Sequence, residues 1–377
     1  MDERLEELGA LQAAFAGRAQ IQQWARGAEL LALLQATSDT KTLDLLTRPI
    51  TAETLATITG ITTDRAHRII EVLQAAGVVR KADDSSPAYV LSPEFGALHA
   101  GASGVEMATV LEASNAALER VHSTFSPPTA YDWESDALVI ARDWGVRPTQ
   151  AARSMFVMAY DALPAYRDRL AAGGPLLDVG SGVGGAALSA LVEYPALRAV
   201  TVERPSDVVE ELRQRAQATG VTARLDLRHS HAQELDDDAV YGVCYWAQAF
   251  FPSHTRESTL AAIRRALAPG GLLLAQEVAA PADDTTSARL GAALDALVAD
   301  CGGLPPVVSA EDLAAELRAG GFTHVEVVTT PVGRLVLGRR GQSLATPAAG
   351  AGVRFRADLL ASSGSPSAAV GACAGGL

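Results

Sequence analysis

Cysteine is scarce in this sequence, whose 377 residues include only Cys244, Cys301 and Cys373. Three cysteines that lie far apart do not form a disulfide framework, so we expect reduced thiols and a cytoplasmic protein. No spacing of cysteine and histidine resembles a metal site, and we predict no metal. Residues 1–7 are charged and helical in pattern, without the basic and apolar regions of a signal peptide.

Long apolar runs and an excess of positive charge are also lacking. No run of about eighteen apolar residues occurs, so no membrane span is predicted. The net charge of −13 argues against a general affinity for nucleic acid or anionic membranes. The hydrophobic content of 48% is ordinary for a globular protein, and the length suffices for two domains. We therefore expect a small-molecule partner, with no nucleic acid and no membrane.

Residues 176–185 indicate a nucleotide-type binding site, because they combine an apolar strand, a glycine turn and the start of a helix. Gly180, Gly182 and either Gly184 or Gly185 allow the backbone to turn sharply and expose its N–H groups to a ligand. Glu203 ends the next apolar run, where a carboxylate can accept hydrogen bonds from both hydroxyls of a ribose. The pattern predicts a cofactor that contains a nucleoside.

Two cofactor classes fit this turn. Residues 180–185 satisfy the dinucleotide pattern G-x-G-x-x-G, which alone is a weak signal. Asp178 would repel a pyrophosphate but can face the cationic methionine end of a sulfonium cofactor. Together these residues resemble the first motif of class I S-adenosylmethionine (SAM)-dependent methyltransferases. A nicotinamide or flavin site, and a turn that binds nothing, remain alternatives.

The rest of the chain extends this resemblance to the two-domain small-molecule O-methyltransferases. Residues 267–271 match their L-x-P-G-G element. From residue 173 to 340 strands and helices alternate, and a turn at residues 331–333 predicts a hairpin that ends the sheet antiparallel. The expected fold is α/β: a Rossmann-like seven-stranded SAM-methyltransferase domain with an N-terminal α-helical winged-helix dimerisation domain. Residues 341–377, rich in Ala, Gly, Ser and Pro, are expected to form a flexible tail.

Residues 1–100 are predicted to form helices followed by a small winged helix. Apolar residues recur at helical spacing from Leu5 to Phe15, and a second apolar helix is expected around residues 30–34. A winged helix also occurs in DNA-binding regulators, but Asp83 and Asp84 stand at the wing tip, where phosphate contacts would be needed. The resemblance implies instead a domain that pairs two subunits, so we expect a homodimer.

By the same resemblance, the cofactor site comprises Asp178, Gly180, Ser181, Gly182, Gly184, Glu203, Arg204, His231, Ala232 and Trp246. His231 and Ala232 stand where related enzymes place an acid and an apolar residue beside the adenine. A neutral imidazole can accept the adenine hydrogen bond in one tautomer. Linker helices at residues 101–172 are expected to contribute to a pocket for a flat substrate, lined by Trp133, Met155, Phe156, Tyr160, Phe250 and Phe251.

The chain departs from the family at the base. Related O-methyltransferases carry a histidine followed by an aspartate after the strand at residues 240–246, and Ala249 and Phe250 occupy these two positions. Gln248 and His254 are the nearest polar candidates for a catalytic role. A missing base favours methylation of carbon or nitrogen in an aromatic or heteroaromatic molecule, since such acceptors attack before they lose a proton. O-methylation with a displaced base at His231, His254 or His122 remains an alternative, as does a SAM-binding enzyme that transfers no methyl group.

Overall fold

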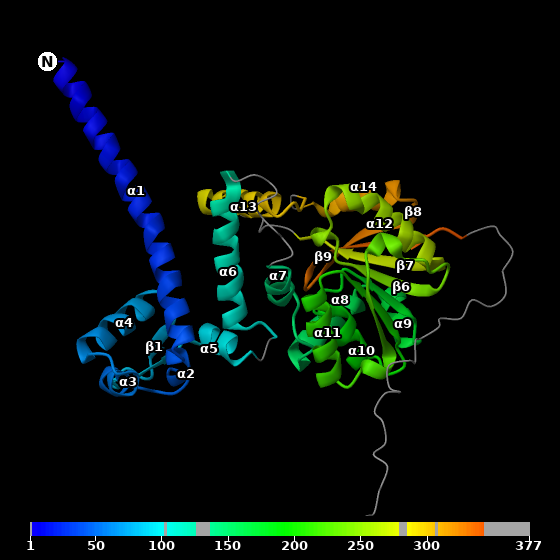
Figure 1. The fold of residues 1–377 in the computed structure, drawn as a ribbon, viewed down its shortest axis with the longest axis horizontal. Coiled ribbons are helices and arrows are strands. Elements are labelled where there is room, and N and C mark those ends of the chain that lie inside the picture. The colour runs from blue at the N-terminus through cyan, green and yellow to red at the C-terminus, as the bar shows by residue number, and fades with distance from the viewer. Residues whose placement is uncertain (1, 102–103, 126–135, 279–284, 306–307, 343–377) are drawn as a thin grey trace, which may run out of the picture.

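The computed structural model describes residues 2–101, 104–125, 136–278, 285–305 and 308–342. An N-terminal helical part lies at one side of the molecule and an α/β part at the other, with two helices, α6 (Met107–His122) and α13 (Thr286–Cys301), between them (Figure 1). Among the described residues, no helix is both long and apolar enough to cross a membrane.

The N-terminal part begins with one long helix. Where two apolar helices were expected between residues 5 and 34, α1 (Asp2–Asp39) is continuous, so that expectation is wrong. Gly9, Gly17 and Gly27 lie within α1; each weakens a helix by about 1 kcal/mol relative to alanine, but no proline breaks it. In Figure 1, α1 projects as a rod away from the elements that follow it. Those elements are α2 (Thr42–Leu45), α3 (Ala52–Thr59), α4 (Thr63–Ala75), β1 (Val79–Lys81), β2 (Tyr89–Leu91) and α5 (Pro93–Ala100).

The predicted wing is present, and threonine side chains cap two of the helices that precede it. The Thr51 side chain accepts a hydrogen bond from the Thr54 N–H, and Thr62 does the same for Arg65. β1 and β2 pair antiparallel as the wing. The core of this part includes Leu55, Ile70, Leu73 and Leu91, and it reaches past residue 100 to Met107 and Leu111 of α6.

Three further helices connect the N-terminal part to the sheet: α7 (Ala137–Trp144), α8 (Gln150–Asp161) and α9 (Pro164–Ala171). Arg120 of α6 holds Asp136, just before α7, through an Nη2–Oδ2 hydrogen bond of 2.7 Å. α7 packs against α11 (Ser206–Ala218) and α8 against α10 (Gly185–Glu193), so both helices cover the sheet domain. Trp133, predicted to bind substrate, lies outside the described residues.

The α/β part is built on a seven-stranded sheet of order β5-β4-β3-β6-β7-β9-β8. The five strands from β5 to β7 pair in parallel, whereas β9 is antiparallel to both β7 and β8, so the predicted antiparallel ending is confirmed. The strands are β3 (Leu176–Val179), β4 (Ala199–Glu203), β5 (Leu225–His229), β6 (Tyr241–Trp246), β7 (Leu267–Gln276), β8 (Phe322–Thr330) and β9 (Gly333–Arg340). Besides those already named, its helices are α12 (Ser253–Ala266) and α14 (Ala310–Ala319).

Both faces of the sheet are buried, because successive side chains of a strand point to opposite faces. Leu177 and Val179 of β3 join a core with α12 and α14, while Leu176 joins a second core with α8 to α11. Parallel strands buried on both faces place their carboxyl ends at one edge of the sheet, which is where ligands bind in open α/β folds. The tail predicted at residues 341–377 lies outside the described residues except for Gly341 and Gln342.

Candidate active site

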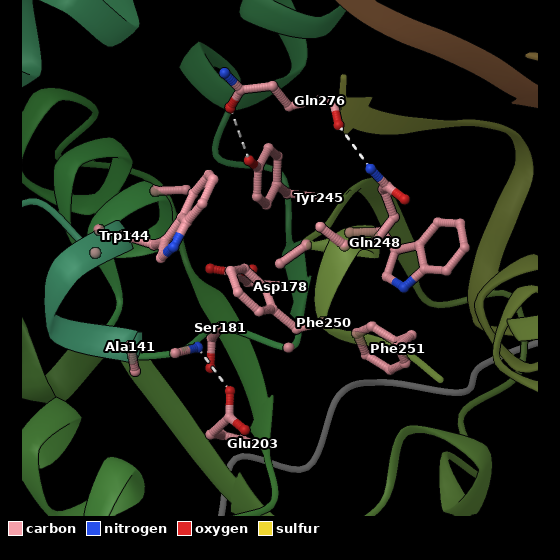
Figure 2. Close-up of a pocket in the computed structure, with 18 of the residues that line it drawn as sticks. Ala141, Trp144, Asp178, Ser181, Glu203, Tyr245, Gln248, Phe250, Phe251 and Gln276 are labelled. Carbon is pink, nitrogen blue, oxygen red and sulfur yellow. Dashed lines mark hydrogen bonds between the residues drawn. The ribbon is translucent and has the colours of Figure 1, made fainter. Parts of the chain in front are cut away.

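A cavity of about 870 Å³ opens at the carboxyl ends of β3, β4, β6 and β7. Its walls come from α7 and α8, the glycine turn after β3 and the segment that follows β6, which contains a short 3-10 helix, η6 (Gln248–Phe250). Figure 2 shows the side chains that surround this space. Its volume lies near the upper end of the range for small-molecule sites.

The glycine turn forms one wall, and its backbone conformation explains why glycines are needed. Gly180 and Gly182 have φ of 71° and 52°, a left-handed conformation that other residues rarely adopt. A Cβ on Gly180 would lie only 2.7 Å from the Phe251 ring, so the turn and the segment after β6 meet there without room for a side chain. Ser181 also lines the cavity, and its hydroxyl is buried without a hydrogen-bond partner among the described residues.

Glu203 closes over this turn from the end of β4. Its Oε2 accepts a hydrogen bond of 2.6 Å from the Gly182 N–H, and its Oε1 accepts one of 2.9 Å from the Arg204 N–H. Burial raises the pKa of Glu203, and these two backbone N–H groups oppose the rise. Glu203 and Arg204 both line the cavity, as their prediction as cofactor-binding residues requires.

Asp178, in β3, is the most deeply buried acid of the site. Its side chain lines the cavity although the residue is only 1% exposed. Neither carboxyl oxygen has a hydrogen-bond partner among the described residues. Burial raises the pKa of Asp178 to about 7, and the nearby Glu203 adds to the rise.

The residues predicted at the adenine end also reach the cavity. His231 is exposed and precedes a short 3-10 helix, η5 (Ala232–Glu234), in which Ala232 is buried. His231 and Glu234 form a reciprocal capping box. Trp246 is fully buried at the end of β6, packs edge-on against Phe251 and contributes to the wall.

Aromatic side chains form another part of the cavity wall. Trp144 of α7 and Phe250 of η6 make an edge-to-face contact, with ring centroids 5.7 Å apart. Met155 and Phe156 of α8 line the same space. Trp144 is 55% exposed, so this pair stands at the open side of the cavity. Phe156, Phe250 and Met155 were predicted to bind substrate, and their position is compatible with that role.

The two catalytic candidates differ in their surroundings. Gln248 is buried, and its Nε2 donates to the Gln276 carbonyl oxygen at 3.1 Å while its Oε1 accepts from Arg256 at 3.0 Å. Both ends of this amide are therefore used to fix the segment after β6. His254, in the first turn of α12, is exposed but lines the cavity.

Two predicted site residues are placed elsewhere by packing. Tyr160 is only 4% exposed and belongs to the core between α8, α9 and the sheet, with its ring 5.6 Å from that of Tyr166. Gly184 precedes α10, where a Cβ would lie 2.2 Å from Leu212, so its lack of a side chain serves helix packing. Among the described residues that line the cavity, neither is present, and we correct both assignments.

Sequence reasoning missed several wall residues. Tyr245 of β6 donates a hydrogen bond to Oε1 of Gln276 at 3.4 Å, and Gln276 in turn donates to the Val332 carbonyl oxygen at 3.0 Å. Glu277, beside them, has a side chain only 7% exposed. All three stand at or just beyond the carboxyl ends of predicted strands, and this position was the signal available in the sequence. No group of three His, Cys, Asp or Glu side chains within the described ranges is arranged to hold a metal ion.

The chain is similar to known methyltransferases in part of its sequence and in its fold. Residues 176–271 match the family model of a methyltransferase domain. An O-methyltransferase family protein from Burkholderia thailandensis is similar in fold: TM-score 0.63, 15% identity, covering 86% of this chain and 98% of the other. Human N-acetylserotonin methyltransferase in complex with SAM is also similar in fold, with a TM-score of 0.59 and 13% identity. The match covers 86% of this chain and 98% of the other.

A third similar structure is N,N-8-amino-8-demethyl-D-riboflavin dimethyltransferase from Streptomyces davawensis. It has a TM-score of 0.56 and 19% identity, and the match covers 86% of this chain and 98% of that one. No curated protein sequence matches the chain. At these identities the likeness establishes the fold, and it extends over nearly the whole of each similar structure.

Proposed function

We propose that this SAM-dependent methyltransferase, which has the two-domain fold of the small-molecule O-methyltransferases, methylates carbon or nitrogen of an aromatic or heteroaromatic small molecule. The proposal rests on Ala249 and Phe250, which line the cavity and occupy the two positions at which the resemblance implies a histidine base and an aspartate. An alcohol or phenol needs a base to become a good nucleophile at neutral pH. An electron-rich ring carbon or a neutral amine does not.

The cavity residues fit the cofactor. Asp178 offers a buried carboxyl with two oxygens that lack a partner among the described residues, and the glycine turn lines the cavity beside it. Glu203 lines the cavity at the end of β4, where a carboxylate can accept hydrogen bonds from both hydroxyls of a ribose. SAM, when bound, supplies an electrophilic methyl group on a positively charged sulfur. We propose that Asp178, Ser181 and the backbone of the glycine turn hold its methionine part, and that Glu203, His231 and Ala232 hold its adenosine.

The aromatic end of the cavity supports a flat acceptor. The rings of Trp144, Phe250 and Phe156 can hold an aromatic acceptor against the methyl donor and exclude water. Alignment of the acceptor atom within about 3–3.5 Å is the main requirement of such a transfer. Burial raises the pKa of Tyr245, which therefore stays neutral and can orient the acceptor through a hydrogen bond rather than act as a base.

A stepwise binding and product assay tests this proposal. Calorimetric titration with SAM and, separately, with NADH checks the cofactor, and we expect only SAM to bind. Matched pairs of aromatic amines and phenols with the same ring are then incubated with SAM, and products are analysed by mass spectrometry and fragmentation. We expect a methyl group on nitrogen or carbon, and methyl ethers alone would contradict the proposal.

Two cavity residues favour O-methylation as a second candidate. His254 lines the cavity, and so does Glu277, whose Oε1 accepts from the Ala310 N–H at 2.8 Å. If either is a displaced base, His254→Ala or Glu277→Gln lowers the maximal rate with phenols far more than with amines. Under the favoured proposal, amine methylation in His254→Ala stays within a few-fold of the wild type. A product without added methyl mass would instead indicate an enzyme that uses SAM without transferring its methyl group.

We further propose that two copies pair through the N-terminal helices. Residues 6–29 of α1 are exposed throughout, including Phe15 at 58% and Trp24 at 58%. A helix with apolar side chains that its own chain does not cover needs another surface against it. We also propose a cytoplasmic location, which the reduced, buried Cys244 supports.

A further inference from the structure

Asp178 combines three properties that do not usually occur together. It is 1% exposed, it lines the cavity, and neither of its oxygens has a hydrogen-bond partner among the described residues. Buried carboxyl oxygens in folded proteins nearly always have a partner, so such a group calls for an explanation. A ligand that enters the cavity is one explanation that the geometry supports.

Within the part of the chain that the structure describes, the groups whose charges act on Asp178 are not positive. Glu203 stands at the end of the neighbouring strand β4 and disfavours ionisation of Asp178. Strand β6 contributes Cys244 and Tyr245, and α8 and α9 contribute Tyr160 and Tyr166. The charge of the Asp178 carboxylate raises the pKa of each of these four groups. Helix α10 contributes no charge; the Ala187 N–H lowers the pKa of Asp178 in part but makes no hydrogen bond of good geometry with its carboxyl. Arg204 acts on Glu203 instead.

In this arrangement, none of the groups that act on an ionised Asp178 is a cation, so its negative charge is stabilised only when a cationic ligand enters the cavity. A buried carboxyl in such surroundings is stabilised in its protonated form. A cation within a few ångströms reverses the preference, because the ion pair favours the carboxylate. The burial that raises its pKa to about 7 puts the change within the physiological range.

We propose that Asp178 selects the cofactor by charge: it is protonated while the cavity holds no cation, and it becomes a carboxylate and releases one proton when a cationic ligand binds beside it. The inference rests on the proposed use of SAM. The proton passes from the carboxyl to solvent, and the ligand's positive charge takes its place. S-adenosylhomocysteine, whose sulfur is neutral, gains less from the carboxylate than SAM does.

The pH dependence of binding follows from the fraction of protein that is ready to bind. When only the ionised form binds well, the apparent dissociation constant is the intrinsic one divided by the ionised fraction. With a pKa of about 7, affinity for SAM rises about tenfold from pH 6 to pH 8. Proton release accompanies binding, close to one proton at pH 6 and close to none at pH 8.

Isothermal titration calorimetry of the full-length protein measures both quantities. SAM and S-adenosylhomocysteine are titrated at pH 6, 7 and 8 in two buffers of different ionisation enthalpy, which gives the number of protons released. The positively charged sulfur lowers the pKa of the SAM amino group relative to that of S-adenosylhomocysteine, so the titration of each free ligand is measured separately and subtracted. We expect a steeper rise of affinity with pH for SAM, and equal slopes for the two ligands would overturn the selection by sulfonium charge.

Two variants complete the test. In Asp178→Asn we expect weaker SAM binding at pH 8 and loss of the proton release at pH 6. The matched control is Asp143→Asn, since burial also raises the pKa of Asp143, which does not line the cavity. We expect this control to keep the wild-type pH profile. Binding of SAM to the wild type at pH 6 with no proton release would overturn this inference alone, whereas no SAM binding at any pH would overturn the proposed function as well.

Discussion

The buried Asp178 carboxyl also makes the free energy of unfolding depend on pH when no ligand is bound. The Asp178 carboxyl has a pKa of about 7 in the folded protein, against an ordinary value of 3.8 that applies to the unfolded chain. As pH rises from 4 to 7, the unfolded state gives up a proton that the folded state keeps. The free energy of unfolding therefore falls by up to about 1.4 kcal/mol per pH unit in this window and levels off above it.

Asp178→Asn removes this titration and provides the first prediction for the ligand-free protein. We expect the stability of the wild type relative to the variant to fall steeply from pH 5 to pH 7 and to fall by less than about 0.5 kcal/mol more from pH 7 to pH 8. Urea unfolding at each pH measures the difference. A difference that does not change with pH would show that Asp178 is already ionised in the folded state.

Gly184 provides a second prediction, because a side chain there has no space. Its φ is 85°, and an added Cβ would lie 2.2 Å from Leu212. We expect Gly184→Ala to lower the free energy of unfolding by about 2–4 kcal/mol from strain and overpacking together.

The matched control for Gly184 is Gly220→Ala, where φ is 71° but nothing lies within 4 Å of the added Cβ. We expect this control to lose only about 1–2 kcal/mol, the cost of the left-handed conformation. Equal losses in the two variants would show that Leu212 moves aside without penalty. Unfolding in urea measures both.

At the residue scale, the sequence predicted what depends on local backbone chemistry. The positive φ of Gly180 and Gly182 and the position of Glu203 follow from a strand, a turn and a second strand. The errors at Tyr160 and Gly184 have a different origin. Whether a side chain on a helix faces a cavity or the core depends on how helices pack, which the residue's own segment does not contain.

At the scale of elements, the segment after β6 is held by one buried arginine. Arg256 of α12 pairs with Glu316 of α14 at 2.6 Å, contacts both the side chain and the backbone carbonyl of Gln248, and lies over the Trp246 ring. These contacts fix η6, and with it the Phe250 side of the cavity. The sequence showed only an arginine in an amphipathic helix.

Replacement of this arginine gives the third prediction. Arg256→Met leaves Glu316 and the Gln248 carbonyl without their partner, so we expect the free energy of unfolding to fall by about 3–5 kcal/mol. Arg213→Met, which breaks an exposed pair with Glu210, is the control and should lose less than about 1 kcal/mol. Urea unfolding compares the two variants, and similar losses would contradict a structural role for the Arg256 contacts.

The order of strands was less accessible to sequence reasoning than their existence. The number of strands and their alternation with helices between residues 173 and 340 were predicted and are confirmed. The place of β9 between β7 and β8 does not follow from the chain order. It results from pairing between β7 and β9, a contact between segments about sixty residues apart.

At the scale of the whole molecule, α1 is the helix whose apolar side chains remain exposed in the single chain. Leu8, Leu11 and Phe15 lie on one side of the helix, while Ile21 and Trp24 lie on roughly the opposite side, at about 100° per residue. All five are at least half exposed. Side chains on two sides are not covered by one neighbouring helix, which favours an arrangement in which a second copy contacts α1 over much of its length.

Charge placed on each of these two sides tests the pairing. We expect Phe15→Asp and Trp24→Asp each to convert the dimer to a monomer at micromolar concentration, because a carboxylate is desolvated on association without a partner. Gln23→Asp adds the same charge at an exposed polar position between the two apolar sides of the helix and should remain dimeric. Light scattering coupled to size-exclusion chromatography gives the mass of each variant. A wild-type protein that is monomeric under the same conditions would contradict the homodimer, and a dimer that survives both substitutions would place its interface on another surface.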